Sequence, residues 1–169
     1  MMSKEESITI GLAGEESIDD VEILWKALHQ HHEQVAPHFG ITLELDESWK
    51  RRKANYQKWL IEPQTRLFIA KENDKSVGYA LVRISGGSET WKSGDQIAEI
   101  ETFSILLEYR NIGLGSRMMA EIYAFLREEG IREIGVTVVD TNVDAIGFYQ
   151  KHGFGNRYVY LWGDVPKVD

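Results

Sequence analysis

"EYRNIGLGSRMM", residues 108–119, decides the fold class, because two glycines stand two apart between an apolar strand pattern and an amphipathic run. Glycine loses more conformational freedom on folding than any other residue, so Gly113 and Gly115 indicate backbone that must be open or closely approached. Backbone N–H groups at the start of a helix form an anion site together with the helix dipole. On their own, the two glycines fit such a site and a tight strand-to-helix turn equally well.

Two other glycine-rich phosphate motifs do not fit this stretch. A dinucleotide fingerprint needs a third glycine, but Met118 stands there and the motif lies late in the chain. A P-loop needs Lys followed by Ser or Thr after its second glycine, and neither follows Gly115 in that order.

The composition narrows the function classes further. The chain has 169 residues, no cysteine and a formal net charge of −8, which excludes disulfides and thiolate metal sites and argues against nucleic-acid binding. The basic run at 50–53 is interpreted as a solvated helix face. No apolar run approaches the ~20 residues of a membrane helix, and the first residues lack a signal-peptide core, so we expect a cytoplasmic protein without membrane contact.

Apolar periodicity and turn residues predict an α/β fold of one domain over residues 1–169, a mixed sheet covered by helices. Ser17 and Asp20 are spaced as a capping box for a first helix that ends near Pro37, and Thr141 and Asp144 have the same spacing before the last helix. The other predicted helices cover 47–60 and 116–129, and the predicted strands cover 7–13, 65–73, 76–85, 96–107, 132–140 and 154–162.

The segment 110–115, Arg-Asn-Ile-Gly-Leu-Gly, matches the R/Q-x-x-G-x-G/A signature of the GNAT superfamily of acyl-CoA-dependent N-acetyltransferases. The segment 136–154 is similar to the family's second signature, and together the two span about 97–154, although Leu107 replaces a commonly seen proline. The resemblance implies a mostly antiparallel sheet whose central strands splay to admit the coenzyme A arm, and acetyl-CoA as co-substrate without a metal.

The resemblance also implies which residues bind the cofactor. The backbone from Asn111 to Ser116 would hold the pyrophosphate, and Phe103, Ser104 and Ile105 would pair with the pantetheine arm. Asn142 matches a further cofactor contact, with helix capping as its alternative role. The implied cofactor set is Phe103, Ser104, Ile105, Arg110, Asn111, Ile112, Gly113, Leu114, Gly115, Ser116, Asn142 and Tyr149.

Acetyl transfer to an amine needs a proton acceptor for the amine and a proton donor for the leaving thiolate. Tyr149 matches the family tyrosine that donates to the coenzyme A sulfur, with packing on the sheet as the alternative. Glu99 and Glu101 lie two apart on one strand and hence on one face, so either is a candidate base. A rim charge or a salt bridge is the alternative for both.

The acceptor is the least determined feature of the sequence. The resemblance places the first helical segment beside the acceptor, and candidate neighbours are Trp25, His29, His32, Phe39 and Trp91. His29 and His32 share a helix face but lack a third ligand, so we expect no metal. The acidic balance favours a small primary amine such as a polyamine, amino sugar or amino-acid derivative. A peptide or protein amine and a non-catalytic acyl-CoA-binding module are the alternatives, and a homodimer is left open.

Overall fold

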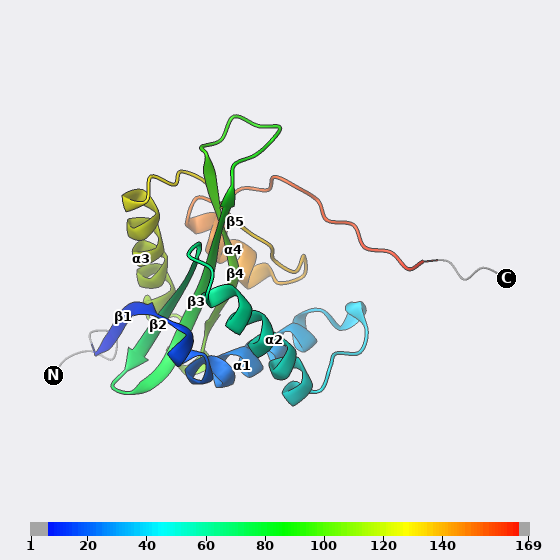
Figure 1. Ribbon diagram of the computed structural model, residues 1–169. Coiled ribbons are helices and arrows are strands. Elements are labelled where there is room, and N and C mark those ends of the chain that lie inside the picture. Colours follow the sequence, from blue (N-terminus) through cyan, green and yellow to red (C-terminus); the bar gives the residue numbers. More distant parts are fainter. Residues whose placement is uncertain (1–6, 166–169) are drawn as a thin grey trace.

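The computed structural model describes residues 7–165, which form one five-stranded sheet in the order β1-β2-β3-β4-β5 with helices on both faces (Figure 1). The first four strands pair antiparallel, and β5 pairs parallel to β4. The strands are β1 (Ile8–Ala13), β2 (Thr65–Glu72), β3 (Lys75–Gly86), β4 (Gln96–Ile105) and β5 (Ile134–Val136). This confirms the predicted mixed, mostly antiparallel α/β sheet.

The helices are α1 (Glu22–Val35), α2 (Leu45–Leu60), α3 (Leu114–Glu128) and α4 (Val143–Lys151). Short 3₁₀ turns lie at Glu15–Ser17, Asp19–Val21, Pro37–Phe39 and Leu107–Tyr109. Tyr56 of α2 packs edge-on against Tyr79 of β3, whereas Phe125 of α3 packs against Phe68 of β2. Since Phe68 and Tyr79 lie on opposite faces of the sheet, α2 and α3 cover opposite faces.

A β-bulge in β4 determines the shape of the sheet around the site. Leu81 lies opposite Thr102 and Val82 lies opposite Ile100, so Glu101 is the extra residue. A bulge bends a strand and increases its local twist. β5 pairs with β4 only as far as Ile100, and residues 101–105 of β4 have no partner in β5. The two strands therefore separate at the bulge, which confirms the expected splay.

Several predicted boundaries are wrong at helix starts. Ser17 ends one 3₁₀ turn (Glu15–Ser17), a second turn (Asp19–Val21) follows it, and α1 begins only at Glu22 with no side-chain cap. At α4 the cap is Asn142, whose Oδ1 accepts from the Ala145 N–H at 3.2 Å, rather than Thr141. The Thr141 hydroxyl instead donates to the carbonyl of Val35 and ties this turn to the end of α1.

The two last predicted strands also differ from the structure. The segment 132–140 forms only the three residues of β5, because the bulge turns β4 away beyond Ile100. The segment 154–162 forms no strand and runs away from the sheet towards the C-terminus (Figure 1). Its apolar side chains, from Tyr158 to Trp162, are 75–85% exposed. A strand needs a neighbouring strand, and this segment has none among residues 7–165.

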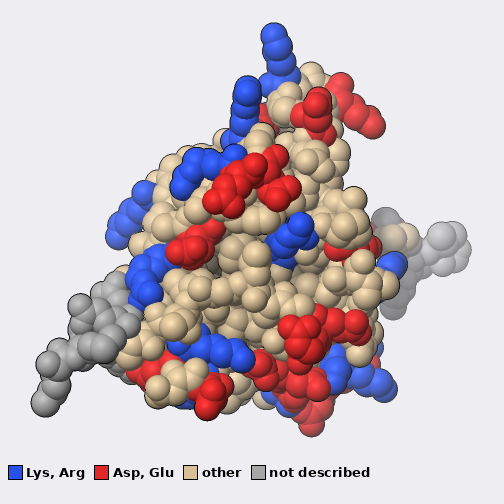
Figure 2. Space-filling view, turned by 60° about the vertical axis from the view of Figure 1, so that its left-hand side comes forward, with Lys and Arg blue, Asp and Glu red and all other residues tan. Residues whose placement is uncertain are grey.

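Acidic and basic side chains are interspersed on the face shown in Figure 2. Several form ion pairs across elements, such as Lys71 with Asp20 at 2.8 Å and Arg157 with Glu133 at 2.9 Å. Exposed pairs of this kind contribute ~0–1 kcal/mol each, so the fold depends chiefly on its buried apolar core. Within residues 7–165, no helix is long and apolar enough to cross a membrane.

Candidate functional site

The start of α3 presents a row of free backbone donors. The backbone N–H groups of residues 111–116 make no hydrogen bond to any described residue, and no side chain caps the helix. Asn111 and Gly113 both adopt positive φ, at 60° and 87°, which turns the chain sharply into the helix. Successive N–H groups in such a turn, at the positive end of a helix dipole, form a concave anion site.

Gly113 and Gly115 each have a different physical reason for being glycine. Gly113 is the N-cap of α3 and has left-handed backbone, a conformation that L side chains rarely adopt. A Cβ on Gly115 would lie 3.0 Å from the Phe148 ring of α4, so a larger residue here would have to displace that ring. Close approach of a phosphate to either glycine stays a prediction.

Three side chains surround these free donors. Arg110 donates from Nε to the carbonyl of Ile105 at 2.9 Å, which ties the turn to the end of β4. The Ser116 hydroxyl lies 3.1 Å from Nε2 of His152, and the His152 ring packs against Phe148. Sequence reasoning missed His152, because nothing in the spacing shows that the end of α4 meets the start of α3.

The predicted pantetheine segment lies on the part of β4 that β5 leaves unpaired. The side chain of Ser104 is buried and donates to the carbonyl of Leu24 in α1 at 2.9 Å. The Ser104 hydroxyl is therefore not available to a ligand. Ile105 and Phe103 face the other side of the sheet, where Phe103 packs against Phe148. Asn142, also predicted here, is buried and engaged as the helix cap.

Tyr149 lies beside Phe103, in an aromatic cluster completed by Phe148 and Phe154. The side chain is 8% exposed, and its hydroxyl makes no hydrogen bond to any residue in the described part of the chain. Burial raises the pKa of Tyr149 well above its ordinary value of about 10. The hydroxyl therefore stays protonated at neutral pH and has an unused donor.

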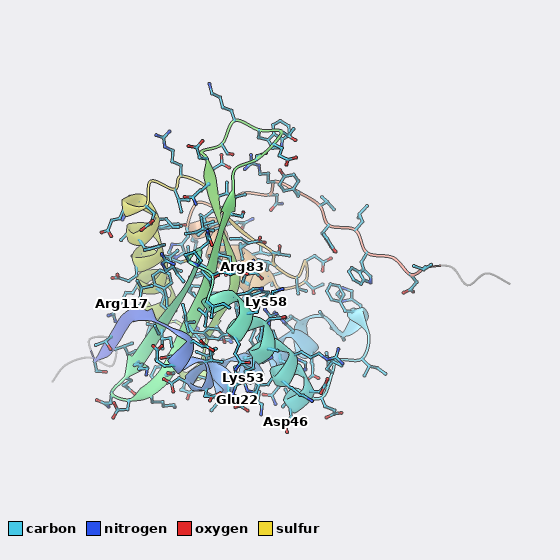
Figure 3. The ribbon with its side chains drawn as sticks, viewed as in Figure 1. Glu22, Asp46, Lys53, Lys58, Arg83 and Arg117 are labelled. Carbon is cyan, nitrogen blue, oxygen red and sulfur yellow. The ribbon has the colours of Figure 1, made fainter. Side chains whose placement is uncertain are left out.

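Glu99 and Glu101 lie on the α2 side of the sheet, Glu99 two residues before the bulge and Glu101 in it. Glu99 stands opposite Arg83 in the β3–β4 register. Arg83, labelled in Figure 3, donates from Nη1 to Glu101 Oε1 at 3.3 Å, and its Nη2 lies 3.4 Å from Glu62, just after the end of α2. The two predicted carboxylates are thus together, and Glu101 is the one at the point where β4 and β5 separate.

The helix-borne acceptor candidates form a hydrogen-bonded group between α1 and α2. Trp25 donates from Nε1 to the Ser48 hydroxyl at 3.2 Å, and that hydroxyl lies 2.9 Å from His29 Nδ1. His29 Nε2 lies 2.9 Å from the carbonyl of Leu43, which can only accept. Nε2 therefore carries the proton, and in the neutral ring Nδ1 accepts from Ser48. Burial and the nearby positive charges of His31, His29 and Arg52 lower the pKa of His32.

The remaining two candidates, Phe39 and Trp91, make no ring contact with Trp25, His29 or His32 in the described part of the chain. Phe39, in the turn after α1, is 68% exposed and packs against His38. Trp91 is 55% exposed on the β3–β4 loop, at the top of Figure 1, whereas α1 and α2 lie at the bottom. The structure therefore brings Trp25, His29 and His32 together but not Trp91.

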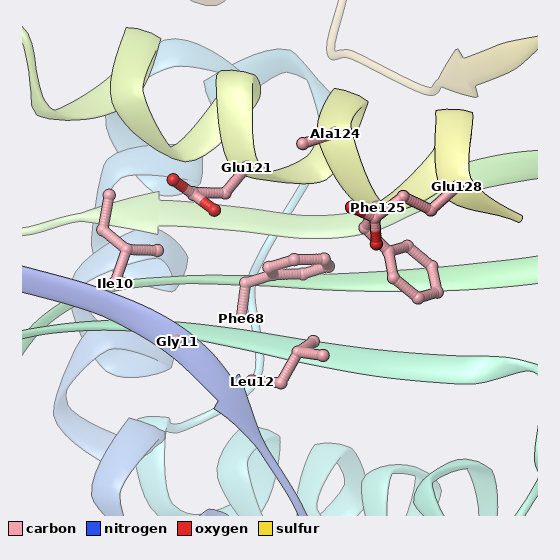
Figure 4. A pocket seen from close by; sticks show the side chains of 8 residues that line it. All are labelled: Ile10, Gly11, Leu12, Phe68, Glu121, Ala124, Phe125 and Glu128. Atoms are coloured by element: carbon pink, nitrogen blue, oxygen red, sulfur yellow. The ribbon is translucent and has the colours of Figure 1, made fainter.

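A hollow on the other side of the molecule lies between β1 and α3 (Figure 4). It is lined by Ile10, Gly11, Leu12, Phe68, Glu121, Ala124, Phe125 and Glu128. None of these residues belongs to the start of α3, to the unpaired end of β4 or to α4, so the hollow is not part of the candidate site. Nowhere in residues 7–165 do three or more His, Asp or Glu side chains gather as a metal-ion cage.

Comparison with known families agrees with this geometry: the model of the acetyltransferase (GNAT) family matches residues 25–154. The chain belongs to the GNAT family. The matched range contains α1 from residue 25 on, all of α2–α4 and β2–β5, and every predicted catalytic residue. It confirms the resemblance found in the two glycine-containing segments.

Individual relatives are more distant. An uncharacterized N-acetyltransferase of Methanocaldococcus jannaschii is 27% identical over 105 residues, which are 62% of this chain and 46% of that protein. The chain therefore matches less than half of that relative's length.

Among solved structures, a GCN5-related N-acetyltransferase from Ralstonia eutropha superposes with a TM-score of 0.76 at 12% identity, covering 93% of this chain and 98% of the other. An aminoglycoside N-acetyltransferase in complex with CoA gives 0.69 at 15% identity, covering 94% of each. At these identities the likeness concerns the fold.

Proposed function

We propose that the chain is an N-acetyltransferase that moves an acetyl group from acetyl-CoA to a primary amine of a small molecule. The observation that carries the proposal is the row of free N–H groups at residues 111–116, beside the unpaired end of β4 and the free hydroxyl of Tyr149. The N–H groups would hold a pyrophosphate, and the unpaired end of β4 would hold an extended arm that carries amide groups. The Tyr149 hydroxyl would then act at the end of that arm.

The donor set fits coenzyme A in its chemistry. A pyrophosphate carries negative charge and accepts several hydrogen bonds, which the α3 N-terminus offers without competing caps. An extended pantetheine has amide groups that can pair with the open backbone of residues 101–105, as an added strand would. When bound, acetyl-CoA supplies an activated thioester, and the chain needs only to position it and move two protons.

The residues of the chain have distinct tasks in that transfer. Glu101 or Glu99 accepts the proton that the amine loses as its nitrogen forms the new C–N bond, directly or through water. Among residues 103–105, the backbone N–H groups that point away from β3 polarise the thioester carbonyl. Tyr149 donates its hydroxyl proton to the sulfur as the C–S bond breaks. Glu101 is the better placed base, because the bulge puts it where the two strands part.

A thiol-release screen with acetyl-CoA over small amines and short peptides tests the proposal. We expect turnover with small primary amines. Turnover confined to peptides would favour the peptide-amine alternative, and acetyl-CoA binding without release from any amine would favour a non-catalytic module. The aminoglycoside acetyltransferases among the structural neighbours make amino sugars one class to include.

A further inference from the structure

Arg52 differs from the other basic residues of its helix. It lies in the basic run 50–53 of α2, which the sequence predicts as a solvated face, but it points onto an aromatic floor instead. Its Cζ lies 4.1 Å from the ring centroid of Trp25, 5.5 Å from that of Tyr56 and 5.8 Å from that of Trp59. Stacking on aromatic faces leaves the N–H edge of a guanidinium free.

The two residues adjacent to Arg52 in the chain, Arg51 and Lys53, are each paired with a carboxylate, whereas Arg52 is not. Arg51 pairs with Glu47 at 2.9 Å, and Lys53 pairs with Asp19 (Figure 3). Arg83, whose Cζ lies 4.7 Å from the ring centroid of Trp59, contacts Glu62 and Glu101. Throughout residues 7–165, no carboxylate lies within ion-pair distance of Arg52. A partly buried, unpaired guanidinium in an acidic protein points to an anionic ligand.

This guanidinium lies close to the proposed chemistry. The Tyr56 ring beneath it carries a hydroxyl that lies 2.8 Å from the Thr102 hydroxyl and 3.0 Å from that of Tyr79. Thr102 follows Glu101 directly in the bulge. One tyrosine ring therefore separates a free cationic group from the candidate base, both on the α2 side of the sheet.

We propose that Arg52 binds a carboxylate on the acceptor, so that the acceptor is an amino acid or a derivative that keeps its free carboxylate. The inference rests on the proposed acetyl transfer and selects one of its acceptor classes. A molecule that carries both groups would place its amine at Glu101 and its carboxylate at Arg52, in the fork geometry that guanidinium and carboxylate share. A polycation has no carboxylate to pair with Arg52, and its positive charges would be repelled by the guanidinium.

The test compares L-amino acids with their carboxamides and decarboxylated amines, with acetyl-CoA and thiol release as the assay. We expect wild-type kcat/KM to favour the best carboxylate-bearing amine over its carboxamide by about 10- to 100-fold, the size of one charged hydrogen-bonded contact. Arg52→Gln should reduce that preference to a few-fold. Arg51→Gln, next to it in an exposed ion pair, should leave the preference intact and is the matched control.

A binding measurement separates this proposal from the proposed function. Calorimetry should show that the N-acetylated amino acid binds wild type and binds Arg52→Gln at least 10-fold more weakly. Efficient turnover of polyamines or amino sugars but not of carboxylate-bearing amines would overturn the role of Arg52 and leave acetyl transfer standing. A preference unchanged in Arg52→Gln would overturn it as well. Absence of acetyl-CoA binding by wild type would refute the proposed function itself.

Discussion

Replacing Tyr149 by Phe removes one hydroxyl and leaves the aromatic cluster with Phe103, Phe148 and Phe154 in place. That hydroxyl has no hydrogen-bond partner among residues 7–165, so the change in unfolding free energy should stay below about 1 kcal/mol. For a chain of this length, this corresponds to a shift in Tm of less than about 4 °C. General acid catalysis is worth ~10²–10⁴-fold, so kcat should fall by that factor with acetyl-CoA affinity nearly unchanged.

The pH dependence adds a second readout for the same variant. Because burial raises the pKa of Tyr149 above the unfolded value of about 10, the hydroxyl is fully protonated below pH 10. The wild-type and Tyr149→Phe rate profiles should therefore have the same shape below that pH and differ only in height. Tyr123→Phe is the matched control, since that hydroxyl donates to the carbonyl of His152 at 2.7 Å and should affect stability rather than kcat.

Steady-state thiol release at saturating acetyl-CoA, with single-turnover measurements to confirm that chemistry limits the rate, is the assay. An unchanged kcat under chemistry-limited conditions would assign Tyr149 to packing alone. A fall in Tm of many degrees would show that the hydroxyl has a structural partner.

Three further predictions concern the base, the helix start and the buried hydroxyls. Glu101→Gln should erase the acidic limb of the kcat/KM profile while Glu99→Gln spares it; the reverse result would exchange their roles, and two unchanged profiles would place the base elsewhere. Gly113→Ala should lower the unfolding free energy, measured in urea, by ~1–2 kcal/mol, because the backbone at Gly113 is left-handed. Gly147→Ala in α4, where no atom lies within 4 Å of the added Cβ, should be neutral or stabilising. Equal effects of the two substitutions would refute the backbone argument. Tyr56→Phe should lower the unfolding free energy by ~1–3 kcal/mol at pH 7, because the buried hydroxyls of Thr102 and Tyr79 lose a hydrogen-bond partner. The difference in unfolding free energy between wild type and variant should narrow above pH 10, because wild type loses stability as the pH rises towards the raised pKa of Tyr56. A difference that stays constant with pH would contradict this.

Much of the fold follows from the sequence because helix and strand periods are local signals. The order of the four helices and five strands, and Gly130 with its positive φ after α3, agree with the pattern. The two capping-box spacings predicted the wrong helix starts. Ser and Thr before an apolar run also occur in 3₁₀ turns and in hydrogen bonds to distant backbone, as the bond from Thr141 to the Val35 carbonyl shows.

Long-range pairing accounts for the other differences. The strand character of residues 154–162 is real as a propensity, but a strand also needs an edge to pair with, which no local pattern reveals. The same limit applies to the site. The phosphate turn is a contiguous motif, whereas the meeting of Ser116 with His152, and of Arg52 with Trp25 and Tyr56, depends on how separate helices dock.

The central claim is that the α3 N-terminus binds the pyrophosphate of acetyl-CoA, and calorimetric titration tests it most directly. We predict binding with one acetyl-CoA per chain in wild type and in Gly155→Glu, an exposed glycine outside the site. Gly115→Glu adds a negative charge within the row of six free N–H groups and a Cβ 3.0 Å from the Phe148 ring. It should abolish binding while circular dichroism shows a folded protein, and inorganic pyrophosphate should compete in wild type. No binding by wild type, or wild-type affinity in Gly115→Glu, would contradict the account.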